Sequence, residues 1–154
     1  MTSERRVLVR ESWQIHLQLE RLVNRRLAAA DLTGAQALAL LYIRGQPAGA
    51  SATALYRTAH HSKATVSTLI RRLRDKGYVR AERCREDDRR RLLFLTDKGQ
   101  QLQDFLEASF RDAENSLYRG FSAQELVQLE QLQRKMLQNL AESQVTSQKE
   151  ASTT

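Results

Sequence analysis

Apolar residues recur every three or four positions along most of the chain, which is the spacing of helices with one buried face. The pattern predicts helices at about residues 3–30, 35–44, 51–59, 63–76, 96–118 and 122–142. The 35–44 segment is apolar on nearly every side, so we expect it to be buried between other elements. From residue 143 the chain turns polar, and its composition predicts a disordered tail over residues 143–154.

Capping signals mark several of the expected helix ends. A Ser or Thr followed three residues later by Glu or Gln has the spacing of a capping box, in which side chains and backbone N–H groups satisfy each other. A Ser before a helix and a Gly after one are typical N-cap and C-cap residues. These signals are the pairs Thr33–Gln36 and Ser122–Glu125, together with Ser62 and Gly77.

Two short segments, residues 78–83 and 91–95, are predicted to be β-strands. The segment between them, residues 84–90, is charged almost throughout, so we expect a hairpin with a charged tip longer than a two-residue turn. A hairpin that follows a run of helices gives the element order of a winged helix-turn-helix. The predicted fold is therefore mainly α-helical with a small β-hairpin.

Positive charge is concentrated in this same central part of the chain. The net charge is +7 over 154 residues, but residues 35–99 carry +8, residues 1–34 carry +2 and residues 100–154 carry −3. A basic module between near-neutral or acidic helices favours binding to a polyanion. On charge alone, a solvated basic surface explains this distribution equally well.

The composition excludes several other classes of protein. A single cysteine rules out an internal disulfide framework, and no apolar run approaches the ~20 residues of a membrane-spanning helix. The charged N-terminus lacks the apolar core of a signal peptide, so we expect a cytoplasmic protein. The sequence shows no nucleophile–base arrangement, Gly-rich phosphate loop or metal-ligand cluster, so we expect neither an enzyme nor a protein with a cofactor or metal.

The expected 63–76 helix carries the residues best suited to reading DNA. Its large apolar residues share one face, while small hydroxyl residues and arginines occupy the rest. Small side chains at the N-terminus let a helix end enter a major groove, and Arg71 and Arg72 can reach guanine edges or phosphates. The alternative is an ordinary core helix with a solvated face. The expected major-groove residues are Ser62, Lys63, Thr65, Ser67, Thr68, Arg71 and Arg72.

The hairpin tip places arginine at the end of a thin β-ribbon, which suits insertion into a narrow minor groove. Asp87 and Asp88 are unexpected on a DNA-binding surface unless one of them pairs with a wing arginine and orients it. A catalytic carboxylate pair is the other interpretation, but a solvated tip cannot raise a carboxyl pKa by desolvation. The expected wing residues are Asp87, Arg89 and Arg90.

The central segment resembles the MarR family of bacterial transcription regulators over about residues 30–100. The most specific feature is an Asp-x-Arg wing at 87–89 followed six residues later by Leu-Thr-x-x-Gly at 95–99. Weaker matching pieces lie at residues 32–36, 62–67 and 73–80. The resemblance implies a homodimer joined by intertwined N- and C-terminal helices, with residues 62–72 in the major groove. It also implies that Arg89 enters the minor groove with Asp87 supporting it.

On this basis residues 32–99 are predicted to form a winged helix-turn-helix DNA-binding domain, and residues 1–31 and 100–142 a helical dimerisation region. We expect a homodimeric transcription regulator, acting as a repressor on pseudo-palindromic double-stranded DNA, associated with the nucleoid in the bacterial cytoplasm. The alternative is a winged-helix protein-interaction module that uses its basic face on an acidic partner.

One part of the hairpin departs from the family pattern. Arg91 stands where the family usually has an apolar residue, and Leu92 and Phe94 place apolar side chains on the strand face expected to point outward. Two explanations are open: Phe94 packs on a neighbouring helix, or the strand is shifted by one residue.

Three residues outside the central segment have functional interpretations. Trp13 and His16 are candidates to line a pocket for a small aromatic or phenolic effector, as in relatives, although core or dimer packing explains them as well. Cys84 lies near the base of the wing. We interpret Cys84 as a bystander, because the resemblance to peroxide-sensing relatives would place the reactive cysteine in the first helix.

Overall fold

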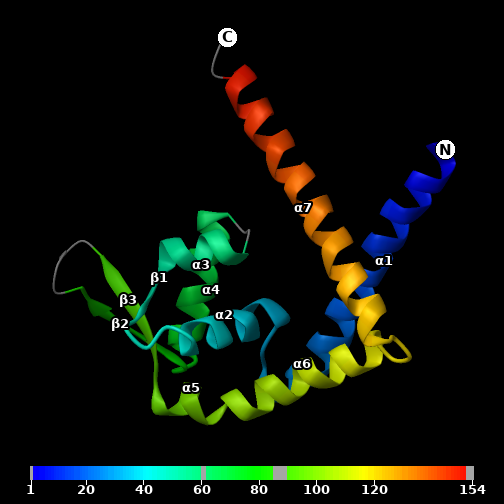
Figure 1. The fold of residues 1–154 in the computed structure, drawn as a ribbon. Coiled ribbons are helices and arrows are strands. Elements are labelled where there is room, and N and C mark those ends of the chain that lie inside the picture. The colour runs from blue at the N-terminus through cyan, green and yellow to red at the C-terminus, as the bar shows by residue number, and fades with distance from the viewer. Residues whose placement is uncertain (1, 60–61, 85–89, 152–154) are drawn as a thin grey trace. The chain divides into compact units, whose positions relative to one another are not determined.

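The computed structural model describes residues 2–59, 62–84 and 90–151. The chain forms two compact units, residues 1–117 and residues 118–154. Both units are predominantly helical, and the first also contains a small antiparallel sheet (Figure 1). The elements of the first unit are α1 (Thr2–Leu27), η1 (Ala28–Ala30), α2 (Gly34–Arg44), β1 (Ala50–Ser51), α3 (Ala52–Ala59), α4 (Lys63–Asp75), β2 (Val79–Arg83), β3 (Arg91–Leu95), α5 (Asp97–Gln101) and α6 (Gln103–Leu117). The second unit contains α7 (Ala123–Ala151).

The predicted capping signals are confirmed at the starts of the helices. At α2 the Thr33 hydroxyl accepts the Gln36 N–H at 3.3 Å, and the Gln36 side chain accepts the Thr33 N–H at 3.1 Å. Ser122 and Glu125 form the equivalent pair before α7, through bonds of 2.8 and 3.2 Å. Each box satisfies backbone donors that have no partner inside the helix, so the start of the helix is fixed locally.

The end of α4 is also the one that the sequence predicts. Gly77 lies in the left-handed region with φ 75°, donates its N–H to the carbonyl of Arg74 at 2.9 Å, and is followed by Tyr78, which donates to Leu73 at 3.0 Å. These two bonds define a Schellman motif, and glycine is the residue that adopts its left-handed position without steric cost.

The hydrophobic core of the first unit joins helices that are distant in sequence. The largest completely buried side chains come one each from α1, α2, α4 and α6, and they are Leu27, Leu40, Leu73 and Leu106. As expected, α2 is a largely buried helix, although Leu38 on its outer side is 57% exposed. The core therefore packs α4 against α2 while leaving the opposite side of α4 open to solvent.

The hairpin belongs to a three-stranded sheet in the order β1-β3-β2, and the pattern did not predict β1. β1 pairs antiparallel with β3 through Ala50 opposite Leu93. Leu93 and Leu95 face the core, with only 3% and 8% of their surface exposed, so the strand is not shifted by one residue. On the outward face of β3, the Phe94 ring packs on Gly49 in the loop before β1 and lies beneath Arg80 of β2.

Two predicted helix boundaries are wrong. The expected 96–118 helix is interrupted at Leu102, so that α5 and α6 are separate helices. Gly99 in α5 lies so close to Tyr78 that an added Cβ would stand 2.3 Å from the Tyr78 carbonyl oxygen, and this packing holds α5 at the base of the sheet. At the other end, the expected disordered tail is helical as far as Ala151, because residues 144–151 contain no Gly or Pro and include the good helix formers Gln, Lys, Glu and Ala.

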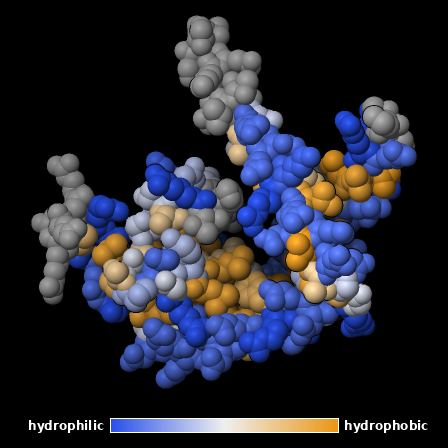
Figure 2. Space-filling view, in the orientation of Figure 1, coloured by the Kyte–Doolittle hydropathy of each residue, from blue (hydrophilic) through white to orange (hydrophobic). Residues whose placement is uncertain are grey.

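The surfaces of α1 and α7 are unusually apolar for exposed helices. On α1 the exposed apolar side chains include Trp13 at 72% and Leu8 at 64%, and Figure 2 shows hydrophobic residues gathered on the outside of this helix. On α7 the exposed residues at helical spacing are Leu126, Leu132, Met136, Leu137 and Leu140. No helix among the described residues is both long and apolar enough to cross a membrane.

Candidate nucleic-acid interface

The two faces of α4 divide as the sequence predicts. Val66, Leu69 and Leu73 are buried against the rest of the unit, and Ile70 is half-buried. The predicted contact residues lie on the remaining surface of the helix and its N-cap. Those that are exposed are Ser62, Lys63, Thr65, Ser67, Arg71 and Arg72, and Thr68 is half-buried. The structure therefore brings the whole predicted set together on one side of one helix.

The hydroxyl groups at the N-terminus of α4 are held in place by the helix cap. The Ser62 hydroxyl accepts the Thr65 N–H at 3.1 Å and lies 2.8 Å from the Thr65 hydroxyl. Ser62 is therefore first of all an N-cap residue, and it fixes the direction of the Thr65 side chain. Lys63 and Ser67 are also exposed, so the first turns of α4 present small polar groups and one ammonium group to solvent.

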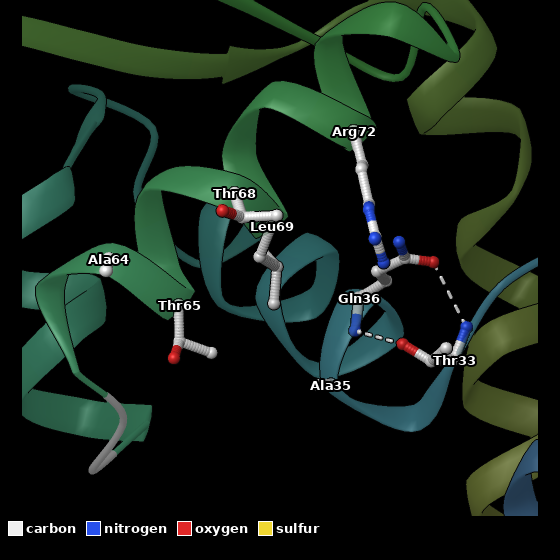
Figure 3. Close-up of a pocket in the computed structure, with 8 residues that line it drawn as sticks. All are labelled: Thr33, Ala35, Gln36, Ala64, Thr65, Thr68, Leu69 and Arg72. Carbon is white, nitrogen blue, oxygen red and sulfur yellow. Dashed lines mark hydrogen bonds between the residues drawn. The ribbon is translucent and has the colours of Figure 1, made fainter.

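A shallow groove of about 430 Å³ runs between the start of α2 and the exposed side of α4. Figure 3 shows the Arg72 side chain extending from α4 toward Gln36, and Thr65 and Thr68 lying along the α4 wall. The lining residues are Thr33, Ala35, Gln36, Ala64, Thr65, Thr68, Leu69 and Arg72. The predicted set omits the α2 side of this groove, and the capping box at Thr33 is the signal that would have located it.

A second groove of about 450 Å³ lies between the C-terminal half of α4 and β2, and arginine dominates its lining. Arg71 and Arg74 come from α4 and Arg80 from β2, with Asp75 as the one acidic lining residue. Across the described ranges neither Arg71 nor Arg74 forms an ion pair, whereas Arg80 pairs with Glu82 and lies 4.9 Å from the centre of the Phe94 ring. Sequence reasoning missed Arg74 and Arg80; the i, i+3 spacing of Arg71 and Arg74 would have indicated the first of them.

The wing is described only up to its two strand ends. Arg83 is paired with Arg91 across the sheet, and the Cys84 N–H donates to the Arg90 carbonyl at 2.9 Å. Arg90 is exposed at the point where the hairpin leaves the sheet. The other predicted wing residues, Asp87 and Arg89, lie outside the described residues.

The residues predicted to line an effector pocket lie on the surface of α1. Trp13 and His16 are both exposed on α1. A groove of about 500 Å³ between α1 and α6 is lined instead by Ile15, Gln18, Leu19, Arg21, Leu22, Arg25, Ser116 and Leu117. Cys84 is a half-buried thiol, and the part of the chain that the structure describes contains no group of three His, Cys, Asp or Glu residues placed to hold a metal ion.

The fold and the exposed α4 define a winged helix-turn-helix protein, and comparison with known proteins gives its family. The MarR family model matches residues 30–90. A MarR crystal structure is 30% identical with a TM-score of 0.67, and the match covers 90% of this chain and 97% of that chain. The chain therefore belongs to the MarR family.

Two further structures show how far the likeness extends. A cysteine-to-serine variant of E. coli MarR complexed with operator DNA is 26% identical, with a TM-score of 0.79 and coverage of 89% of this chain and 98% of that chain. The MepR–DNA complex from S. aureus is 24% identical, with a TM-score of 0.80 and coverage of 85% and 96%. The MepR comparison shows the shared fold, which runs through nearly the whole length of both relatives.

Proposed function

We propose that the protein is a sequence-specific DNA-binding transcription regulator that acts as a homodimeric repressor on pseudo-palindromic operators. The observation that carries this proposal is the exposed side of α4, which presents hydroxyl, ammonium and guanidinium groups together. The E. coli MarR variant of the same family and overall fold was crystallised with operator DNA. A helix of this composition fits the major groove of B-DNA.

The two grooves that α4 lines support different roles for their arginines. Arg72 lines one groove together with Gln36, which supports a role for Arg72 in contacting base edges or a phosphate. Arg71, Arg74 and Arg80 surround a basic groove that suits the phosphate backbone. Phosphate contacts supply much of the affinity and make it salt-dependent, while base contacts discriminate between sequences.

The wing and the dimer complete the proposal. Arg89 enters the minor groove with Asp87 supporting it, as the sequence resemblance implies. Arg90, which is exposed where the hairpin leaves the sheet, contacts the nearby DNA backbone in this proposal. Two copies associate through the exposed apolar faces of α1 and α7, because such faces are costly to leave in water. The two copies of α4 then meet successive major grooves about 34 Å apart.

Regulation follows from the same arrangement. The dimer has two spacings of its α4 helices, one of which fits the operator. A small aromatic or phenolic effector that binds the other spacing more tightly shifts the dimer toward it, and the operator is released. Trp13 and His16 are the proposed residues for such an effector. A regulator of this kind is not an enzyme, and it acts on the chromosome, so we place it in the bacterial cytoplasm with the nucleoid.

Fluorescence anisotropy across a salt series tests the proposal. The labelled duplexes are the DNA upstream of the protein's own coding sequence and a shuffled duplex of the same composition. We expect a preference for the native duplex that persists at physiological salt. Equal binding of both duplexes to the protein, lost as salt increases, would contradict a regulator of its own promoter and favour a basic interaction surface for an acidic protein.

A further inference from the structure

The first helical segment ends in the same motif as α4, but with an aspartate where α4 has Gly77. Asp31 donates its N–H to the Ala28 carbonyl at 3.0 Å, and Leu32 donates to Leu27 at 3.2 Å, which are the two bonds of a Schellman motif. Asp31 has φ 53° and is the one non-glycine residue with positive φ among the described residues. Glycine is favoured at this position, but aspartate tolerates it better than most residues, and it adds a carboxylate that glycine lacks.

The side chain of Asp31 is joined to the end of α4. Lys76, the C-cap residue of α4, places its ammonium 2.8 Å from the Asp31 carboxylate and also donates to the Asp31 carbonyl oxygen. A side chain that reaches both a carbonyl and a carboxylate of one residue is held more firmly than by a single contact. The Lys76 side chain is 28% exposed and the Asp31 side chain is 93% exposed, so the lysine is partly packed while the carboxylate is open to solvent.

The same end of α4 is held from the other side by α5. Lys98 donates to the Lys76 carbonyl at 2.8 Å, and its ammonium lies 4.7 Å from the centre of the Tyr78 ring. The Thr96 hydroxyl, which caps α5, donates to the Gly77 carbonyl at 2.5 Å. The carbonyl groups of Lys76 and Gly77, at the end of α4, are therefore satisfied by side chains from the start of α5.

We propose that Asp31, Lys76 and Lys98 form a clasp that sets the direction of α4 relative to α1 and so positions α4 for operator binding. The inference rests on the proposed function, because a fixed direction matters only if two copies of α4 must match two half-sites. Asp31 lies where the chain passes from the α1 segment, which carries an apolar face for dimerisation, into α2 of the DNA-binding domain. A tie between this junction and the end of α4 limits how α4 can tilt.

Substitutions of Asp31 and Lys76 distinguish a loss of α4 positioning from a loss of folding stability. Asp31→Gly removes the carboxylate while placing the favoured residue in the left-handed position, so we expect an unchanged or higher thermal midpoint but weaker operator binding. Lys76→Met removes both contacts to Asp31, and Lys76→Arg restores a cation. For Asp31→Gly and Lys76→Met we expect operator affinity to fall about threefold per copy and about tenfold per dimer, since partly exposed ion pairs contribute modestly. Arg134→Met, which removes an ion pair with Glu130 on α7, is the matched control.

A spectroscopic measurement reports on the clasp without DNA. Spin labels replace Glu20 on α1 and Ser67 on α4 in a Cys84→Ser background, and excess unlabelled protein removes distances between copies. We expect one narrow distance distribution that broadens in Lys76→Met and narrows again in Lys76→Arg. An unchanged width in Lys76→Met overturns the clasp, and so does a broadened distribution with undiminished operator affinity. Failure of the unsubstituted protein to prefer any operator overturns the proposed function instead, and with it the purpose of the clasp.

Discussion

The Phe94 ring lies directly against the backbone of Gly49, so that a Cβ built on Gly49 would stand 2.7 Å from Cζ of the ring. The same Cβ would stand 2.9 Å from the Leu92 Cβ. The apolar side chains on the outward face of β3 are therefore covered by the loop that precedes β1, and the loop needs glycine there. Gly49 has φ 98°, a conformation that L side chains rarely adopt.

Gly49→Ala is expected to destabilise the protein by about 3 kcal/mol, because it adds left-handed strain to a steric overlap with Phe94 and Leu92. Gly120→Ala is the matched control, since Gly120 has φ 85° with no atom within 4 Å of an added Cβ. The control is expected to cost about 1 kcal/mol from strain alone. Urea unfolding of both variants measures the difference. Equal destabilisation of both would show that Phe94 and Leu92 can move aside.

Two serines of the α4 region are expected to behave differently when replaced by alanine. Ser62→Ala removes the N-cap bond to Thr65 and is expected to lower the free energy of unfolding by about 1 kcal/mol. Ser67→Ala removes an exposed hydroxyl inside the helix and is expected to leave stability within about 0.5 kcal/mol while weakening DNA binding. Thermal unfolding and anisotropy on both variants test this separation. Loss of stability in Ser67→Ala would indicate a structural role for that hydroxyl.

Leu137→Glu is expected to disrupt the dimer, because it places a charge in the apolar stripe of α7 that the proposed interface buries. The dimer dissociation constant should rise at least about 100-fold. Gln138→Glu introduces the same charge on the opposite side of the same helix and is expected to leave the dimer intact. Light scattering after size-exclusion chromatography measures both masses. If the Leu137→Glu protein is still a dimer, the apolar face of α7 is not part of the dimer interface.

Arg89→Ala is expected to weaken operator binding without altering the thermal midpoint, since the wing arginine is proposed to contact the minor groove. Its loss should also reduce the slope of log affinity against log salt by about 1, as for one lost phosphate or groove contact. Arg111→Ala, at an exposed arginine of α6, removes the same charge outside the proposed interface. If both variants bind the operator as the unsubstituted protein does, the wing role is wrong.

The Asp31 carboxyl is expected to titrate below its ordinary range. The hydrogen bond from Lys76, and then its positive charge, lower the pKa of Asp31 from 3.8. Because the folded-state pKa is lowered, the stabilisation is complete above the ordinary pKa and is lost as the pH falls through the lowered value. Carboxyl NMR titration should show the Asp31 pKa rising in Lys76→Met. The pKa of Glu125, which hydrogen bonds from Ser122 lower, should stay unchanged in the same variant.

Much of this protein is determined locally and is therefore visible in the sequence. The capping pair Thr33–Gln36, the N-cap Ser62 and the left-handed Gly77 after α4 each act within a few residues, and the structure has all of them. The division of α4 into a buried and an exposed face follows from helical periodicity alone. These local features are enough to predict a winged helix-turn-helix and the surface that we propose for DNA binding.

The tertiary structure decided the contacts between residues that are far apart in the chain. β1, the break at Leu102, the basic groove with Arg74 and Arg80, and the covering of Phe94 by Gly49 all depend on which segments meet. The same holds for the tie between Asp31 and Lys76. Periodicity and capping residues determine the buried face and the end hydrogen bonds of a single helix or strand. The contacts named here form where one element packs on another, and no local pattern specifies that packing.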